Sequence, residues 1–136
     1  MSESKLHRNM KAVVASELAK EGYEVIEEPL RPPDQFVSWE AYRPDLLGLA
    51  VAEDRREEEY ALVECETRPN TQRLLAKNIW RVQLQSKIDR PSRLRRILVV
   101  PRGRLGDVDL KLRRYCEIWV ADQGDLLKIP MCPLGA

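Results

Sequence analysis

Apolar residues near the N-terminus of this 136-residue chain recur at the spacing of an α-helix. They lie three or four positions apart and share one helical face, and they are Leu6, Met10, Val13, Val14 and Leu18. Gly22 follows this run as a stop signal. We therefore predict a helix from about residue 5 to residue 21.

Shorter apolar runs further along the chain predict β-strands, because charged residues, glycine or proline bound them. Residues 97–100 are an uninterrupted Ile-Leu-Val-Val run, which is typical of a central strand covered on both faces. The last run ends at Pro130, which cannot donate a ladder hydrogen bond, so we expect an edge strand there. The predicted strands are residues 23–27, 45–51, 60–66, 97–100, 117–121 and 126–130.

Residues 71–88 and 107–115 carry the helical pattern again. The proline-containing residues 29–41 predict a loop, and the charged residues 53–59 predict a turn of hairpin character. A hairpin or meander therefore comes first, and crossover helices follow. This order predicts a mixed central β-sheet flanked by helices.

Nothing in the pattern marks a second domain or an internal repeat. We therefore predict a single α/β domain over residues 1–136. Its core spans about residues 5–121, and residues 131–136 form a C-terminal tail.

Composition favours a cytoplasmic protein. Apolar residues make up 43% of the chain and charged residues 33%, and no window approaches the roughly 18 apolar residues that span a membrane. The first residues lack the apolar run of a secretory signal, so we expect no membrane partner. The three cysteines are odd in number and widely spaced, which argues against a disulfide framework and against a zinc site. A histidine base would have to be His7, the one histidine.

Charge is divided unevenly along the chain. Residues 1–66 hold 8 Lys/Arg and 16 Asp/Glu, a net charge of −8. Residues 67–136 hold 15 Lys/Arg and 6 Asp/Glu, a net charge of +9. An acidic region suits bound cations and a basic region suits polyanions such as nucleic acid. Alternatively, the two halves interleave in the fold and their charges mix on the surface.

Three carboxylates lie at the ends of two predicted strands. Asp45 begins one strand directly after Pro44, and Glu64 and Glu66 come near the end of the next. Because strand side chains alternate, Glu64 and Glu66 point to one face and Cys65 to the other. If the strands pair through the turn at residues 53–59, Asp45 lies beside Glu64. Crowded carboxylates repel each other, and a divalent metal such as Mg²⁺ or Mn²⁺ resolves that repulsion.

The combination of Pro44-Asp45 with Glu64-Cys65-Glu66 resembles the PD-(D/E)XK nuclease superfamily. The order of helix, strand, Pro-Asp strand, carboxylate strand, helix and apolar strand is also similar to the core of that restriction-endonuclease-like fold. The likeness covers roughly residues 5–121 and is greatest to the small archaeal Holliday-junction resolvases. It implies a metal-dependent DNA endonuclease in which Asp45 and Glu64 hold Mg²⁺ or Mn²⁺, and it implies a homodimer.

The chain departs from the superfamily motif at one position, because Glu66 stands where the motif has lysine. A glutamate supplies no positive charge. Glu66 is therefore either a general base toward a metal-bound water or a further metal ligand.

Two helical residues resemble accessory site residues of the superfamily. Glu17 resembles a helical glutamate that reaches the metal through water, and Lys77 resembles a displaced motif lysine. The alternative for each is an ordinary charged residue on a solvated helix surface.

Basic residues around and after the carboxylates predict contacts with a phosphate backbone. Lysine and arginine recur every four positions along the predicted helix 71–88, and arginine favours bidentate phosphate contacts. The expected DNA-binding residues are Arg43, Arg68, Arg73, Lys77 and Arg81. The alternative is a charged surface paired with acids.

We therefore expect an endonuclease-like protein that hydrolyses DNA phosphodiesters, with Asp45, Glu64 and Glu66 as its metal site. One rival is a catalytically silent nucleic-acid-binding or assembly module with the same fold, which the missing lysine favours. A second rival is an interaction protein with no nucleic-acid role. That rival predicts no DNA binding even at low ionic strength, where phosphate contacts are strongest.

Overall fold

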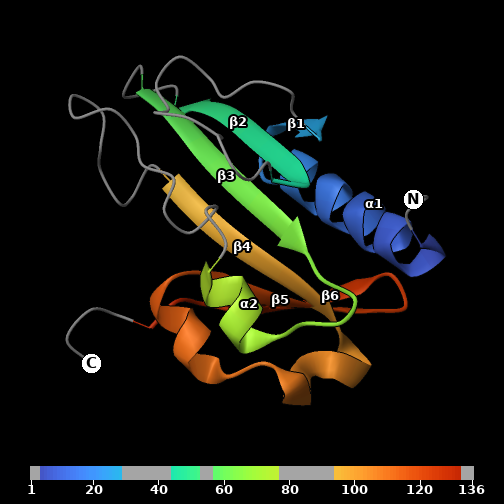
Figure 1. Cartoon of the computed structure of the whole chain (residues 1–136). Coiled ribbons are helices and arrows are strands. Elements are labelled where there is room, and N and C mark those ends of the chain that lie inside the picture. The colour runs from blue at the N-terminus through green and yellow to red at the C-terminus, as the bar shows by residue number, and fades with distance from the viewer. Residues whose placement is uncertain (1–3, 29–43, 53–56, 77–93, 133–136) are drawn as a thin grey trace.

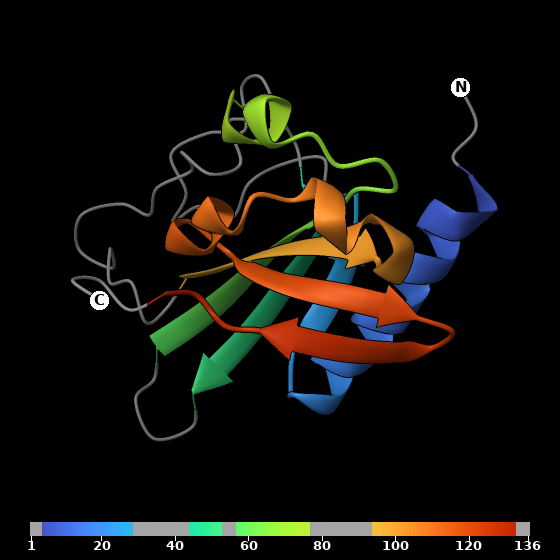
Figure 2. The ribbon, with the colours of Figure 1, turned by 90° about the horizontal axis from the view of Figure 1, so that it is seen from below.

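A mixed β-sheet runs through the molecule and carries helices on both faces (Figures 1 and 2). This structure is a computed structural model, and it describes residues 4–28, 44–52, 57–76 and 94–132. Over these residues it is one α/β domain whose sheet has six strands in the order β1-β2-β3-β4-β5-β6. The strands are β1 (Glu24–Glu27), β2 (Leu46–Ala52), β3 (Glu57–Cys65), β4 (Leu94–Pro101), β5 (Glu117–Asp122) and β6 (Asp125–Ile129).

The strands pair as the sequence predicts for a meander followed by crossovers. β2 is antiparallel to both of its neighbours, β1 and β3. β3, β4 and β5 are parallel, and β6 returns antiparallel to β5. Helix α2 (Thr71–Ala76) lies in the connection from β3 to β4. Two 3-10 helices, η3 (Arg102–Asp107) and η4 (Leu110–Arg114), connect β4 to β5. The predicted mixed sheet flanked by helices is therefore confirmed.

Local hydrogen bonds define both ends of helix α1 (Lys5–Lys20). Ser4 is the N-cap, and its hydroxyl accepts a hydrogen bond of 3.1 Å from the backbone N–H of His7. At the other end, Gly22 adopts a φ of +96°, which glycine tolerates at no steric cost. The N–H of Tyr23 then donates to the carbonyl of Leu18, and the N–H of Gly22 to that of Ala19, as in a Schellman motif. The predicted end at residue 21 is correct within one position.

The sheet separates two apolar layers. Met10, Val14 and Leu18 of α1 pack on one face, against residues such as Val63 and Trp119. Residues of α2, η4 and the loop before η4 pack on the other face, and they include Leu74, Val108 and Leu112. β4 contributes Ile97 and Val99 to the first layer and Leu98 and Val100 to the second. The prediction that residues 97–100 form a strand covered on both faces is confirmed.

The segment between β4 and β5 differs from the predicted helix over residues 107–115. It contains η3 and η4, because Val108 takes an extended conformation with a φ of −100° and a ψ of 123°. Asp109 then caps η4 by accepting a hydrogen bond of 2.9 Å from the N–H of Lys111. The side chain of Val108 is buried in the core, and this packing outweighs the local helical pattern.

Of the predicted helix over residues 71–88, the structure describes α2 and nothing beyond residue 76. The predicted loop 29–41 and residues 53–56 of the predicted turn also lie outside the described residues, whereas residues 57–59 of that turn belong to β3. Within the described ranges, no helix is long and apolar enough to cross a membrane.

Candidate active site

Asp45 is fixed at the point where β2 and β3 begin to pair. Its N–H donates to the carbonyl of Val63 at 2.9 Å, and its carbonyl accepts from Glu28 at 2.8 Å. The pair Leu46–Val63 is the last in the β2–β3 register, so Asp45 comes next to Glu64. The Asp45 carboxylate folds back onto the strand end, where its Oδ2 accepts a hydrogen bond of 2.7 Å from the N–H of Cys65.

Glu64 and Glu66 flank Cys65 at the carboxyl end of β3. Glu64 is only 4% exposed, which is rare for a carboxylate in a folded protein. The side chain of Glu66 is 12% exposed, and its backbone N–H donates to Val99 at 2.9 Å, so the ladder with β4 continues past the strand. Both acids are thus positioned by backbone pairing in the centre of the sheet. We call Asp45, Glu64 and Glu66 the carboxylate cluster.

The pKa of the Cys65 thiol is affected by the charged residues around it. Burial raises the pKa of the Cys65 thiol well above its usual value, and the negative charges of Asp45, Glu64 and Glu66 raise it further. Lys11 acts in the opposite direction and lowers that pKa. Asp45 bonds the backbone of Cys65, and Glu64 and Glu66 flank Cys65 in the chain, so all three predicted carboxylates lie at this end of β3.

Helix α1 contributes two basic side chains to this end of the sheet. His7 Nε2 lies 3.5 Å from Asp45 Oδ2 and 3.0 Å from the carbonyl oxygen of Cys65. Lys11 follows one helical turn later and is only 4% exposed. Its Nζ lies 3.7 Å from Glu28 Oε1, and the backbone N–H of Glu28 donates to the carbonyl of Asp45 at 2.8 Å. A buried ammonium on α1 therefore pairs with Glu28, the residue that contacts the backbone of Asp45.

Reasoning from the sequence missed Lys11. A signal was present, because Lys11 follows Met10 and precedes Val14 on the apolar face of α1. A lysine on such a face is buried with its charge when a carboxylate is near, but periodicity alone cannot say which carboxylate. His7 was singled out only as the one histidine, and the structure places it against Asp45.

Glu66 forms an ion pair with Arg73. Arg73 Nη2 lies 3.2 Å from Glu66 Oε2 and donates to the carbonyl of Arg68 at 3.1 Å. Asn70 accepts from the N–H of Arg73 at 3.0 Å and orders the start of α2. The Arg73 side chain remains 57% exposed, so its guanidinium faces solvent at the rim of the carboxylate cluster. Positive charge thus stands beside Glu66 at the position where the motif has lysine.

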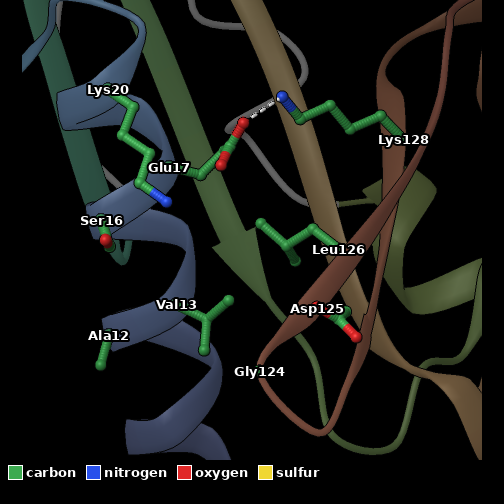
Figure 3. A pocket seen from close by; sticks show the side chains of 9 residues that line it. All are labelled: Ala12, Val13, Ser16, Glu17, Lys20, Gly124, Asp125, Leu126 and Lys128. Carbon is green, nitrogen blue, oxygen red and sulfur yellow. Dashed lines mark hydrogen bonds and ion pairs between the residues drawn. The ribbon is translucent and has the colours of Figure 1, made fainter.

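Glu17 lies away from the carboxylate cluster. Its Oε1 accepts a hydrogen bond of 2.6 Å from Lys128 Nζ of β6, and this bond lowers the pKa of the Glu17 carboxyl (Figure 3). Glu17 lines a pocket of about 690 Å³ between α1 and the β5–β6 hairpin. It stands ten residues after His7 on α1, about 15 Å along the helix axis. The structure therefore does not bring Glu17 together with the predicted metal ligands.

The predicted DNA-binding residues fall into two groups. Arg68 and Arg73 lie just beyond β3, next to Glu66, and both are exposed. Arg43, Lys77 and Arg81 lie outside the described residues, so their predicted roles, including that of Lys77 in the site, stay predictions.

Asp45 and Glu64 offer the oxygen donors that Mg²⁺ and Mn²⁺ prefer. Across the described part of the chain, no group of three or more His, Cys, Asp and Glu side chains is arranged to hold a metal ion. Mg²⁺ commonly binds through one or two protein carboxylates and completes its shell with water and substrate phosphate. Buried Glu64 and partly exposed Asp45, at the ends of adjacent strands, fit that kind of site.

Comparisons of the chain with protein-family models, curated proteins and solved structures found no match. The resemblance to the PD-(D/E)XK superfamily therefore rests on Pro44-Asp45, on Glu64-Cys65-Glu66 and on the order of elements. The geometry of these residues has to carry any functional conclusion.

Proposed function

We propose that this protein is a metal-dependent endonuclease of the PD-(D/E)XK type, which hydrolyses phosphodiesters of DNA. The observation that carries the proposal is the position of Asp45 beside buried Glu64 at the paired ends of β2 and β3. Structural salt bridges between surface side chains rarely require a carboxylate this deeply buried in a sheet. A hard divalent cation offsets the repulsion between such carboxylates.

The topology supports the same proposal. A helix precedes an antiparallel meander, and the meander ends on the carboxylate strand. A helix then leads to a parallel strand whose residues 97–100 are buried. This is the order expected for a restriction-endonuclease-like core. In open sheets of this kind, ligands bind outside the carboxyl ends of the parallel strands, and the carboxylate cluster lies at such an end.

Each residue of the site has a proposed role. Asp45 and Glu64 hold Mg²⁺ or Mn²⁺, which when bound lowers the pKa of a water and polarises the scissile phosphate. Glu66 either accepts a proton from the attacking water or adds a further oxygen ligand. The backbone N–H of Cys65 keeps the Asp45 carboxylate in place.

Positive charge comes from two residues in place of the motif lysine. Lys11 offsets part of the negative charge around Cys65 from the side of α1. Arg73 is anchored by Glu66 and stays exposed, so its remaining N–H donors are available to a phosphate oxygen. Glu66 thereby recruits the charge that it cannot itself supply.

A cleavage screen tests the proposal. Wild-type protein is incubated with Mg²⁺ or Mn²⁺ and with linear, branched, mismatched and single-stranded DNA. We expect metal-dependent cleavage of at least one substrate, and its loss in Asp45→Ala and Glu64→Ala with circular dichroism unchanged. Glu21→Ala, at the far end of α1, is the matched control and retains activity. Robust cleavage by either site variant would contradict the assignment. The expected homodimer is tested separately, by analytical sedimentation of the wild type.

The ion pair between Glu66 and Arg73 favours one second candidate, a catalytically silent module that keeps the fold and binds nucleic acid. In that case the pair fills the place of the motif lysine and serves structure alone. Titration calorimetry separates the two candidates. DNA binding without any Mg²⁺ or Mn²⁺ binding supports the silent module, whereas metal binding that depends on Asp45 supports the nuclease.

A further inference from the structure

We infer that a second pocket, beside the carboxylate cluster, binds a backbone phosphate of the DNA next to the one that is cut. This inference rests on the proposed function, since it names a contact of the same substrate. The pocket has a volume of about 450 Å³, and its polar lining comes from three separate segments of the chain. The lining residues that matter are Ser4, Thr67, Arg68, Gly103 and Arg104.

The position of this pocket links it to the carboxylate cluster. Thr67 and Arg68 are the residues directly after Glu66. Ser4 caps α1, and its hydroxyl accepts a hydrogen bond from the backbone N–H of His7. The side chain of His7 in turn contacts Asp45. Pro101, also in the lining, ends β4 beside the end of β3. A DNA strand bound at Asp45 and Glu64 would therefore run toward this pocket and place a neighbouring phosphate there.

The charge of the lining selects an anion. Two arginines 36 residues apart line the pocket, Arg68 after β3 and Arg104 in η3, and Ser4 and Thr67 add hydroxyl-bearing side chains. Arg104 also has an exposed partner, Asp107, at 3.3 Å, but an exposed pair three residues apart contributes little and leaves most guanidinium donors available. Arginine binds phosphate through paired N–H groups, so two of them in one pocket suit a phosphodiester.

The pocket between α1 and β6 provides a contrast within the same molecule. There Lys20 and Lys128 are accompanied by Glu17 and Asp125, so cations and carboxylates balance (Figure 3). Among the described residues that line the Arg68–Arg104 pocket, none is Asp or Glu. Of the two pockets, only this one has a lining with an excess of positive charge, and it is the one beside the proposed metal ligands.

The salt dependence of DNA binding by the full chain tests the inference. Anisotropy of a labelled duplex is measured without divalent metal, so that binding is separated from cleavage. The double variant Arg68→Ala/Arg104→Ala is expected to bind about tenfold more weakly at low salt. The slope of log Kd against log salt is expected to fall by about 1, as for one lost phosphate contact. Arg102→Ala is the matched control, because Arg102 is bonded to Asp122 at 2.9 Å outside the pocket, and it keeps the wild-type slope.

A second double variant guards against misfolding. Arg68→Lys/Arg104→Lys keeps both charges but loses the paired N–H geometry, so we expect it to keep the wild-type slope with a smaller loss of affinity. Neutral methylphosphonate linkages then locate the contact. The linkage next to the cut is expected to weaken the wild type but not the alanine double variant.

Several outcomes would overturn the inference. They are a wild type that binds no DNA, an unchanged slope in the alanine variant, and an equal loss in Arg102→Ala. An unchanged slope together with cleavage that depends on Asp45 leaves the nuclease standing and removes only the pocket. A reduced slope without any cleavage keeps the pocket and removes the nuclease.

Discussion

The two ends of α1 carry charged groups of similar composition in different surroundings. At its C-terminal end, Glu17 and Glu21 bond Lys128, and Arg95 bonds Glu117 through two contacts of 2.8 Å. At its N-terminal end, His7 and Lys11 approach the carboxylate cluster on the ends of β2 and β3. The first set lies on long side chains at the surface, and the second surrounds a buried thiol. We call them the Lys128 network and the carboxylate cluster.

The difference lies in what holds the carboxylates. In the Lys128 network, flexible cationic side chains come to the acids, and Lys128 and Arg95 also stack on the ring of Trp119. These contacts join α1 to the sheet. In the carboxylate cluster, backbone pairing sets the positions of the acids, and Glu64 is buried by its place in the sheet. Under the proposed function, carboxylates concentrated by the backbone form the binding site, whereas carboxylates matched by mobile cations serve as structural contacts.

The largest effect is expected when a proposed metal-binding carboxylate is removed from the carboxylate cluster. We expect Asp45→Asn and Glu64→Gln each to weaken Mn²⁺ binding by more than about 100-fold, because even changes around metal ligands cost that much. Titration calorimetry measures the affinity. Glu21→Gln, the same kind of substitution in the Lys128 network, should leave it unchanged. Equal affinity in all variants would remove the distinction between the two regions.

Glu66→Gln separates its two proposed roles. We expect the variant to retain Mn²⁺ binding and to lose about 100-fold in the cleavage rate, which is in the range that a general base contributes. Single-turnover cleavage at saturating metal measures the rate. The control is Glu21→Gln, the same kind of substitution in the Lys128 network, which should change neither quantity. Lost metal affinity in Glu66→Gln would instead make Glu66 a ligand.

Lys11→Met tests whether the buried ammonium balances the cluster. We expect a loss of about 2 kcal/mol in the free energy of unfolding without metal, because Lys11 then no longer offsets the negative charge around Cys65. Mn²⁺ should restore more stability in this variant than in the wild type. Chemical denaturation with and without Mn²⁺ measures both, and the exposed Lys20→Met is the control. If Mn²⁺ stabilised Lys11→Met no more than wild type, Lys11 would have no role at the site.

Glu17→Gln should have the smallest effect. Its hydrogen bond to Lys128 holds the pKa of the Glu17 carboxyl below the ordinary value of 4.5, so the carboxylate stabilises the fold at neutral pH. That contribution is lost as the pH falls below 4.5 toward the lowered pKa. Unfolding curves of wild type and variant should therefore differ slightly at pH 7 and converge in acid. Cleavage should be unchanged; a large loss would restore the role in metal binding that its sequence position suggested.

Local patterns predicted most of the fold. Helical spacing located α1, and the apolar run Ile97-Leu98-Val99-Val100 located the central strand, since both follow from side-chain periodicity. The helix expected over residues 107–115 was wrong in type, because burial of Val108 and capping by Asp109 broke it into 3-10 segments. Such tertiary packing is not encoded in a short window of sequence.

For the site, the chain order of Asp45, Glu64 and Glu66 was enough to expect their convergence, because strand alternation and a hairpin-length turn leave few other arrangements. The partners of those residues were a different matter. Glu17 and Lys11 lie only six residues apart on α1, yet one joins Lys128 and the other joins the carboxylate cluster. Which side chains meet across 30 or 100 residues depends on sheet register and on how α1 lies across the sheet. Periodicity is a property of neighbours along the chain, so the sequence alone located most of the helices and strands. The burial of Lys11 and the shared pocket of Arg68 and Arg104 depend on segments that are distant in the chain and that come together only when the protein folds.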